Sequence, residues 1–255
     1  MNTELYLSKL NLKAQAPSLD FLNEIISAHQ RLISFNNLAV FFHPGEILNL
    51  DIGPLFDKVI LRQEGGYCFE NNKVLFFLLQ GLGFEVQPKS ARVIYDKVGD
   101  VPRTHRTTIV TIDGGRYLAD VGFGRDVPPH AVPIGVGQNS GHQVIMNNDL
   151  YYHQLWKEDS PINLYSFDDG FYSESDFAVA SYYTNTHPSS KFVKELIVSR
   201  RDGDLIEFIS GRTFSRIQNK EREDIEITTQ EEFQIYLEKF GIKANYDFSS
   251  LPMSK

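Results

Sequence analysis

Apolar residues in the first third of the chain follow a helical spacing. Within residues 19–35, leucine and isoleucine recur every three or four positions, as in a helix with one buried face. Ser18 precedes this run and suits the N-cap of the helix. A second apolar run, 69–80, is followed by two glycines, which are typical of a helix end. The pattern therefore predicts a helical segment up to about residue 82.

The spacing changes in the middle of the chain. Residues 106–123 form two β-rich runs around Asp113-Gly114, a dipeptide typical of a two-residue hairpin turn. Residues 143–156 repeat this arrangement around an Asn-Asn-Asp segment. We therefore predict that the middle third is all-β.

The last third mixes both types of element. An Asp-Gly pair within 192–209 predicts another hairpin. The run 228–241 predicts a helix, because Thr229 and Glu232 have the spacing of a capping box. The predicted fold class is α+β, with a helical, a β and an α/β domain. The predicted domain bounds are 1–82, 83–172 and 173–255.

Composition and charge narrow the class of protein. The 255 residues are 42% hydrophobic and 23% charged, which is ordinary for a globular protein. A net charge of −8 argues against nucleic acid and anionic membranes as partners. The most apolar run, 74–84, is too short to span a bilayer, and the first residues lack a signal-peptide pattern. We expect a cytoplasmic protein, and the pattern leaves its oligomeric state open.

Cys68 is the only cysteine, and it stands between Gly65-Gly66 and the second predicted helix. A free cysteine is most often a small buried hydrophobe. At a helix N-terminus, however, the helix dipole and the free N–H groups stabilise a thiolate. The glycine pair allows a tight turn, and its N–H groups are candidates for binding an oxyanion. Cys68 is therefore a candidate nucleophile.

A thiolate nucleophile needs a base and a group that orients the base. His105 starts the first middle strand, and Asp120 lies near the end of the second. If the turn consists of Asp113-Gly114 alone, His105 and Asp120 share one face of the hairpin as diagonal neighbours. A three-residue turn would place them on opposite faces. An ordinary strand histidine and a turn aspartate remain the alternative interpretation.

The stretches around these three residues resemble the arylamine N-acetyltransferases. They are GGYCFENN at 65–72, RTHRTTIV at 103–110 and LADVGFG at 118–124, with shorter matches in ISFNNL at 33–38, ARV at 91–93 and HPSSKF at 187–192. The matching stretches follow the order of the family and cover most of the chain. The resemblance implies a helical bundle, a central β-barrel and a C-terminal α/β lid.

The resemblance also implies an activity and a set of roles. A member of this family transfers an acetyl group from acetyl-CoA to an arylamine, an arylhydroxylamine or a hydrazine by a ping-pong reaction. Cys68 would carry the acetyl group as a thioester, His105 would act as the base, and Asp120 would orient His105. This Cys-His-Asp triad is like that of cysteine proteases.

Four further positions match residues that bind substrates in the family. Val93, Phe123 and Phe192 would line the acceptor pocket, and Gly124 would begin the loop that approaches CoA. Acetyl-CoA would be a substrate, with no permanently bound cofactor. We expect no metal site, because the chain has one cysteine and its histidines lack ligand spacing.

Three other functions remain as alternatives. An amide synthase or another acyltransferase would keep the triad and use a different acyl donor. A papain-like or transglutaminase-like hydrolase has similar chemistry, although the surrounding residues match it less well. A catalytically weak homologue would bind CoA or aromatic amines only.

Two positions depart from the family pattern. Glu64 stands where the family commonly has an arginine before Gly-Gly, and Asn36 stands where it has a glutamate. A carboxylate at position 64 that pointed inward would disfavour the thiolate of Cys68. We hypothesise that the two changes occurred together.

Overall fold

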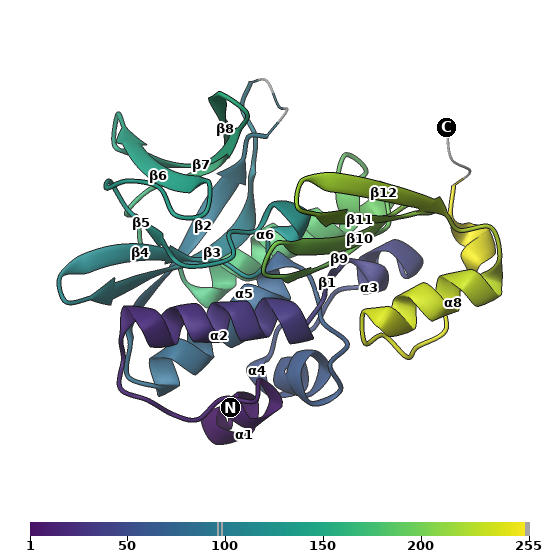
Figure 1. Cartoon of the computed structure of the whole chain (residues 1–255), viewed down its shortest axis with the longest axis horizontal. Helices are drawn as coiled ribbons and strands as arrows, with labels where there is room; N and C mark the ends of the chain where they lie inside the picture. The colour runs from purple at the N-terminus through teal and green to yellow at the C-terminus, as the bar shows by residue number, and fades with distance from the viewer. Residues whose placement is uncertain (96, 98, 253–255) are drawn as a thin grey trace.

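Two antiparallel sheets and a set of helices make up the structure (Figure 1). It is a computed structural model that describes residues 1–95, 97 and 99–252. The helices are α1 (Thr3–Lys9), α2 (Leu19–Leu32), α3 (Leu38–Phe42), α4 (Ile52–Phe56), α5 (Cys68–Gly81), α6 (Glu174–Thr186), α7 (Lys191–Lys194) and α8 (Gln230–Lys239), with a π-helical turn η1 (Asp57–Leu61) and 3₁₀ turns η2 (Gly124–Asp126) and η3 (Phe248–Ser250).

Among the described residues, seven strands form a sheet that curls into a nearly closed barrel. Its strand order is β5-β4-β3-β2-β8-β7-β6. The two edge strands of this sheet, β5 and β6, approach each other just after β5, where Ile134 forms a β-bridge with Val144 of β6. The strands are β2 (Glu85–Val93), β3 (Arg103–Ile112), β4 (Gly115–Ala119), β5 (Val132–Pro133), β6 (His142–Asn147), β7 (Leu150–Lys157) and β8 (Ser160–Phe167).

A second sheet, seen at the right of Figure 1, has the order β1-β9-β10-β11-β12 in the described part of the chain. Its strands are β1 (Phe35–Asn36), β9 (Ile197–Asp202), β10 (Leu205–Ser210), β11 (Thr213–Gln218) and β12 (Glu221–Glu226). Strand β1 comes from the N-terminal third of the chain and the other four strands come from the C-terminal third. This sheet therefore joins the first and last thirds of the chain.

Separate groups of buried side chains hold these layers together. Helices α1, α2, α4 and α5 pack on one face of β3 and β4, and the barrel encloses a second apolar group. A third group lies between the smaller sheet and α8, and it includes Leu38 from the N-terminal third. The division at residues 82 and 172 stays a prediction. No helix in the described ranges is long and apolar enough to cross a bilayer.

The predicted helix at 19–35 is observed as α2, but it ends at Leu32. As predicted, the Ser18 side chain caps it by accepting a hydrogen bond of 3.2 Å from the backbone N of Phe21. The prediction was wrong for its last residues, because Phe35 and Asn36 leave the helix and pair with β9. Pairing with a strand more than 150 residues away overrides the local helical pattern.

The predicted hairpin at 192–209 is also shorter than expected, since β9 begins only at Ile197. The residues before it form the short helix α7 instead. Asn37 explains this change, because its side-chain amide donates hydrogen bonds of 2.7 and 2.8 Å to the carbonyls of Phe192 and Glu195. This long-range contact holds the segment in a turn rather than a strand.

The other predicted elements agree with the structure, except that β4 ends at Ala119, so Asp120 lies just after this strand rather than near its end. The hairpin turn consists of Asp113 and Gly114, both at positive φ, as a type I′ turn requires. Helix α8 begins after Thr229, whose side chain accepts a hydrogen bond of 3.1 Å from the backbone N of Glu232. Strands β6 and β7 form the hairpin expected around the Asn-Asn-Asp segment.

Candidate active site

Cys68 is the first residue of α5, as its sequence context predicts. Gly65 and Gly66 form the turn before the helix, and the φ of Gly65 is +67°. A Cβ on Gly65 would overlap the carbonyl oxygen of Ser34, so backbone and space both require glycine here. The side chain of Cys68 is only 2% exposed.

Replacing Gly65 by alanine is expected to lower the free energy of unfolding by about 3 kcal/mol, from left-handed strain plus overpacking against Ser34. Urea unfolding would measure this loss. Gly45 is a matched control, because its φ is +89° and nothing lies within 4 Å of a Cβ there. Gly45→Ala should show the strain alone, so equal losses at the two positions would refute the overlap argument.

His105 lies beside Cys68 and is fixed by Asp120. The register of β3 and β4 pairs Ile112 with Gly115, which places His105 and Asp120 on one face as the two-residue turn predicts. His105 Nε2 lies 2.6 Å from Asp120 Oδ2, and both side chains are buried. The Sγ atom of Cys68 donates a long hydrogen bond of 3.7 Å to the carbonyl of Thr104, the neighbour of His105. The fold thus brings the three predicted residues together.

Two residues that the sequence interpretation missed complete the surroundings of Asp120. Asn72 donates a hydrogen bond of 2.8 Å to Asp120 Oδ1, and the hydroxyl of Tyr165 donates one of 2.7 Å to Oδ2. The backbone N of Gly122 adds a third donor at 2.8 Å. Asn72 lies one helical turn after Cys68, a spacing that could have identified it. Tyr165 lies on β8 and carries no such signal.

The electrostatics of the site favour an ion pair. Burial opposes the charged form of His105, but the charge and hydrogen bond of Asp120, together with those of Cys68, raise the pKa of His105 to about 10. Burial also opposes ionisation of Asp120, but the charge of His105 and the hydrogen bonds of His105, Asn72 and Gly122 lower its pKa to about 2. His105 is therefore an imidazolium and Asp120 a carboxylate at neutral pH.

The four predicted substrate-binding residues lie around this site. Phe123 packs edge-on against His105, with ring centroids 5.1 Å apart. Val93 pairs with Tyr165, whose ring also packs on His105.

The remaining two lie on the side of the smaller sheet. Phe192 packs against Tyr67 and Phe35, with centroids 5.8 and 6.1 Å away. Gly124 has a φ of +70°, and a Cβ there would lie 3.6 Å from Phe35. Their role in binding substrates stays a prediction.

Glu64 and Asn36 are in contact, but the contact involves the backbone of Glu64 and not its carboxylate. The carboxylate of Glu64 turns to the surface and pairs with Arg62 at 2.8 Å. The Asn36 side chain instead donates a hydrogen bond of 2.9 Å to the backbone carbonyl of Glu64. The negative charge at position 64 is therefore held by Arg62.

Of the two glycine N–H groups expected as oxyanion donors, that of Gly66 is already paired within the chain. The N–H of Gly66 donates to the carbonyl of Ser34 at 3.3 Å, and the N–H of Tyr67 donates to Glu70 Oε2 at 3.0 Å. Among the described residues, the N–H of Cys68 itself donates to no group of the chain. Cys68 N–H at the helix N-terminus is therefore the better donor for an oxyanion.

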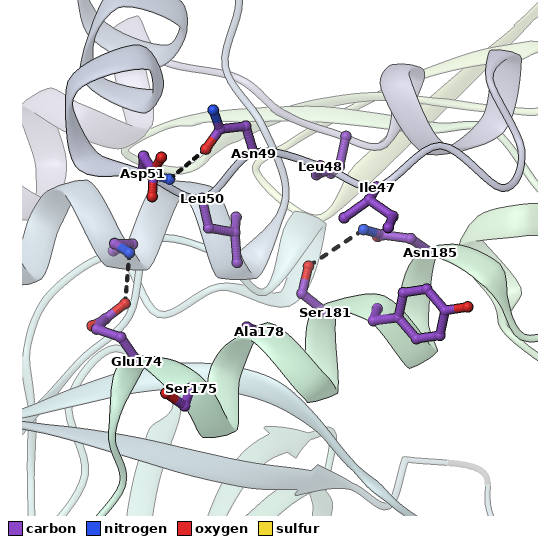
Figure 2. A pocket seen from close by; sticks show the side chains of 12 residues that line it. Ile47, Leu48, Asn49, Leu50, Asp51, Glu174, Ser175, Ala178, Ser181 and Asn185 are labelled. Carbon is purple, nitrogen blue, oxygen red and sulfur yellow. Dashed lines mark hydrogen bonds and ion pairs between the residues drawn. The ribbon is translucent and has the colours of Figure 1, made fainter.

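A pocket of about 510 Å³ lies beside α6 (Figure 2). The segment 47–51 forms one wall and α6 the other, and an ion pair between Lys73 and Glu174 lies at one end. Cys68, His105 and Asp120 do not line it.

Comparisons with known proteins agree with this fold. The sequence model of a family described as N-acetyltransferase matches residues 18–248. Arylamine N-acetyltransferase of Mycobacterium tuberculosis is 35% identical over 218 residues, which cover 81% of this chain and 77% of that protein. Arylamine N-acetyltransferase 1 of Homo sapiens is 28% identical over 265 residues, covering 92% and 91%.

A solved structure extends the match to three dimensions. The arylamine N-acetyltransferase of Mycobacterium marinum in complex with CoA superposes with a TM-score of 0.89 at 28% identity, covering 98% of this chain and 96% of that one. The nearly closed barrel, the helices and these matches define an acyltransferase. The chain belongs to the arylamine N-acetyltransferase family.

Proposed function

We propose that this enzyme transfers the acetyl group of acetyl-CoA to an arylamine, arylhydroxylamine or hydrazine through a thioester on Cys68. The contact of 2.6 Å between His105 and Asp120, beside a buried thiol at a helix N-terminus, carries this proposal. Such a group of residues is suited to nucleophilic acyl transfer.

In the first half-reaction, the Cys68 thiolate attacks the thioester carbonyl of acetyl-CoA. His105, protonated and oriented by Asp120, pairs with that thiolate before attack. The N–H of Cys68 stabilises the oxyanion of the tetrahedral intermediate. The bond between the acetyl carbon and the CoA sulfur then breaks, and the CoA thiolate takes the proton from His105.

In the second half-reaction, the acceptor amine attacks the acetyl-cysteine. Neutral His105 now accepts a proton from the amine nitrogen, so the imidazolium is regenerated. The bond between the acetyl carbon and the Cys68 sulfur breaks, and the thiolate leaves. One residue thus supplies a proton in the first step and removes one in the second.

Four neighbouring residues are proposed to bind the substrates. Phe123, Val93 and Phe192 offer aromatic and aliphatic surface to the ring of the acceptor, and Gly124 lets the backbone of its loop approach the pantetheine chain of CoA. A cytoplasmic location is part of the proposal, because a reducing compartment keeps the Cys68 thiol free.

Intact mass after brief exposure to acetyl-CoA and an acid quench would test the proposal. We expect one added acetyl group on the wild-type chain and none on Cys68→Ala. The acetyl group should leave when an arylamine is added. An unmodified wild-type chain with a reactive thiol would instead support an amide synthase or another acyl donor. An unmodified chain with an inert thiol would support a binding-only homologue.

A further inference from the structure

Helix α6 turns one face towards both catalytic elements. Glu174, Phe177, Ser181 and Asn185 follow each other at intervals of three and four residues, so they share that face. Figure 2 shows Glu174 and Ser181 projecting from this helix, with Asn185 one turn further along. These side chains contact the residues that lie next to the proposed nucleophile and the proposed base.

On the nucleophile side, α6 holds Tyr67, the residue before Cys68. The hydroxyl of Tyr67 lies 2.6 Å from Ser181 Oγ and donates a hydrogen bond of 2.8 Å to Asn185 Oδ1. Tyr67 is fully buried, and it is the N-cap residue of α5. Because the N-cap sets where the helix begins, fixing Tyr67 also fixes the backbone of Cys68.

On the base side, α6 holds Arg106, the residue after His105. Both terminal nitrogens of Arg106 donate to the carboxylate of Glu174, at 3.0 and 2.8 Å. The guanidinium, which is fully buried, lies 4.3 Å from the ring centroid of Phe177. Successive side chains of a strand point to opposite faces, so a fixed Arg106 determines where His105 points.

The same carboxylate also holds the helix of the nucleophile. Lys73 lies on α5, and its Nζ atom is 2.6 Å from Glu174 Oε2. Glu174 thus connects α5, which carries Cys68, with β3, which carries His105. The Glu174 side chain is 42% exposed, but Arg106 and Lys73 are both buried. Buried cations are costly once they lose the carboxylate that pairs with them.

We propose that α6 positions the base against the nucleophile, with Glu174, Arg106 and Tyr67 as positioning residues that touch no substrate. This role rests on the proposed function of Cys68 and His105. The helix sets the distance between Cys68 and His105 through the neighbours of both. Loss of the contacts that α6 makes with Arg106 and Tyr67 displaces the imidazole from the thiol and slows the formation of acetyl-cysteine. The binding of acetyl-CoA is retained.

Glu174→Gln tests this role because it removes the charge and keeps the shape. We expect the single-turnover rate constant for acetylation of Cys68 to fall by about 10²-fold per folded molecule, as for a displacement of about 1 Å at a reacting pair. The KM for acetyl-CoA should change far less than this rate constant.

The C-terminal sheet offers a matched control. Glu207 is also a carboxylate between two cations, and it is buried more deeply than Glu174. Arg200 and Lys239 donate hydrogen bonds to it at 3.1 and 3.2 Å. Glu207→Gln breaks the same kind of ion-pair group without touching α5 or β3. It should lower stability and leave the acetylation rate constant unchanged.

A second variant covers the case in which Glu174→Gln does not fold. Lys73→Met, Glu174→Leu and Arg106→Met together remove all three charges and leave none unpaired, a change that is often neutral for stability. This triple variant should fold and acetylate slowly. Acetylation at the wild-type rate by the folded triple variant would overturn the positioning role, as would equal rate losses in Glu174→Gln and Glu207→Gln.

Iodoacetamide separates this proposal from the proposed function. Alkylation of Cys68 depends on the thiolate and its pairing with His105, and it needs no CoA. If wild type fails to form acetyl-cysteine, the acetyl-transfer function fails. Slower alkylation of Glu174→Gln than of Glu207→Gln would still support the positioning role, and equal alkylation rates would overturn it.

Discussion

Replacing Asp120 by asparagine is expected to slow the acetylation of Cys68 by about 10⁴-fold, the loss typical of the same change in a serine protease triad. Asparagine keeps the shape of the side chain but offers one acceptor oxygen and no charge. His105 then loses the charge and the hydrogen bond that raise its pKa, and the hydroxyl of Tyr165 loses an acceptor. The imidazolium is no longer favoured beside the thiol.

Single-turnover kinetics with acetyl-CoA at neutral pH would measure this loss, and near-UV circular dichroism would verify the fold. Asp168→Asn is a matched control. Like Asp120, Asp168 accepts a hydrogen bond from a tyrosine hydroxyl, that of Tyr172. It also accepts one from the backbone N two residues later, that of Gly170. It also pairs with a cation, Arg103. A rate for Asp120→Asn within tenfold of the Asp168→Asn rate would contradict the orienting role.

The contact between His105 and Asp120 could be predicted because one local feature sets it. Asp113-Gly114 favours a two-residue turn, and that turn determines which residues of β3 and β4 share a face. The start of α5 at Cys68 could also be predicted from neighbouring residues, because a glycine turn precedes it and an apolar run follows it. The family followed from short motifs that surround these residues, and the comparisons confirm it.

Contacts between distant parts of the chain could not be predicted in this way. Phe35 leaves its helical pattern because β9, more than 150 residues later, provides a pairing partner. Tyr165 reaches Asp120 across 45 residues of sequence. Spacing within a segment determines which face of an element is apolar, but not which other element covers that face.

The ion pair between Arg106 and Glu174 of α6 shows that long-range contacts of charged residues are equally hard to predict from sequence. Arg106 in a β-rich run is ordinarily expected to be solvated, because arginine is rarely fully buried unless it is paired. Here it is fully buried, since Glu174, 68 positions later, neutralises it. The sequence around Arg106 does not predict its pairing with Glu174, and the reverse also holds. The burial of Arg106 therefore follows only from the packing of α6.

The ion pair of the active site should also appear in the pH dependence of stability. The pKa of His105 rises from 6.5 to about 10 on folding, so its contribution is complete below pH 6.5 and is lost as the pH rises through about 10. The pKa of Asp120 falls from 3.8 to about 2, so its contribution is complete above pH 3.8 and is lost as the pH falls through about 2. The pair therefore stabilises the fold most between pH 3.8 and 6.5.

Urea unfolding of the wild type and of Asp120→Asn, at constant ionic strength, would isolate this contribution. Above pH 6.5, the difference between their free energies of unfolding should shrink by up to about 1.4 kcal/mol per pH unit, the value for one proton. Asp168→Asn should show no such slope, because its partner Arg103 keeps its charge throughout. A flat difference between wild type and Asp120→Asn from pH 6.5 to 10 would mean that His105 is not held as an imidazolium, and proton transfer from the Cys68 thiol would then have to occur during the attack on acetyl-CoA.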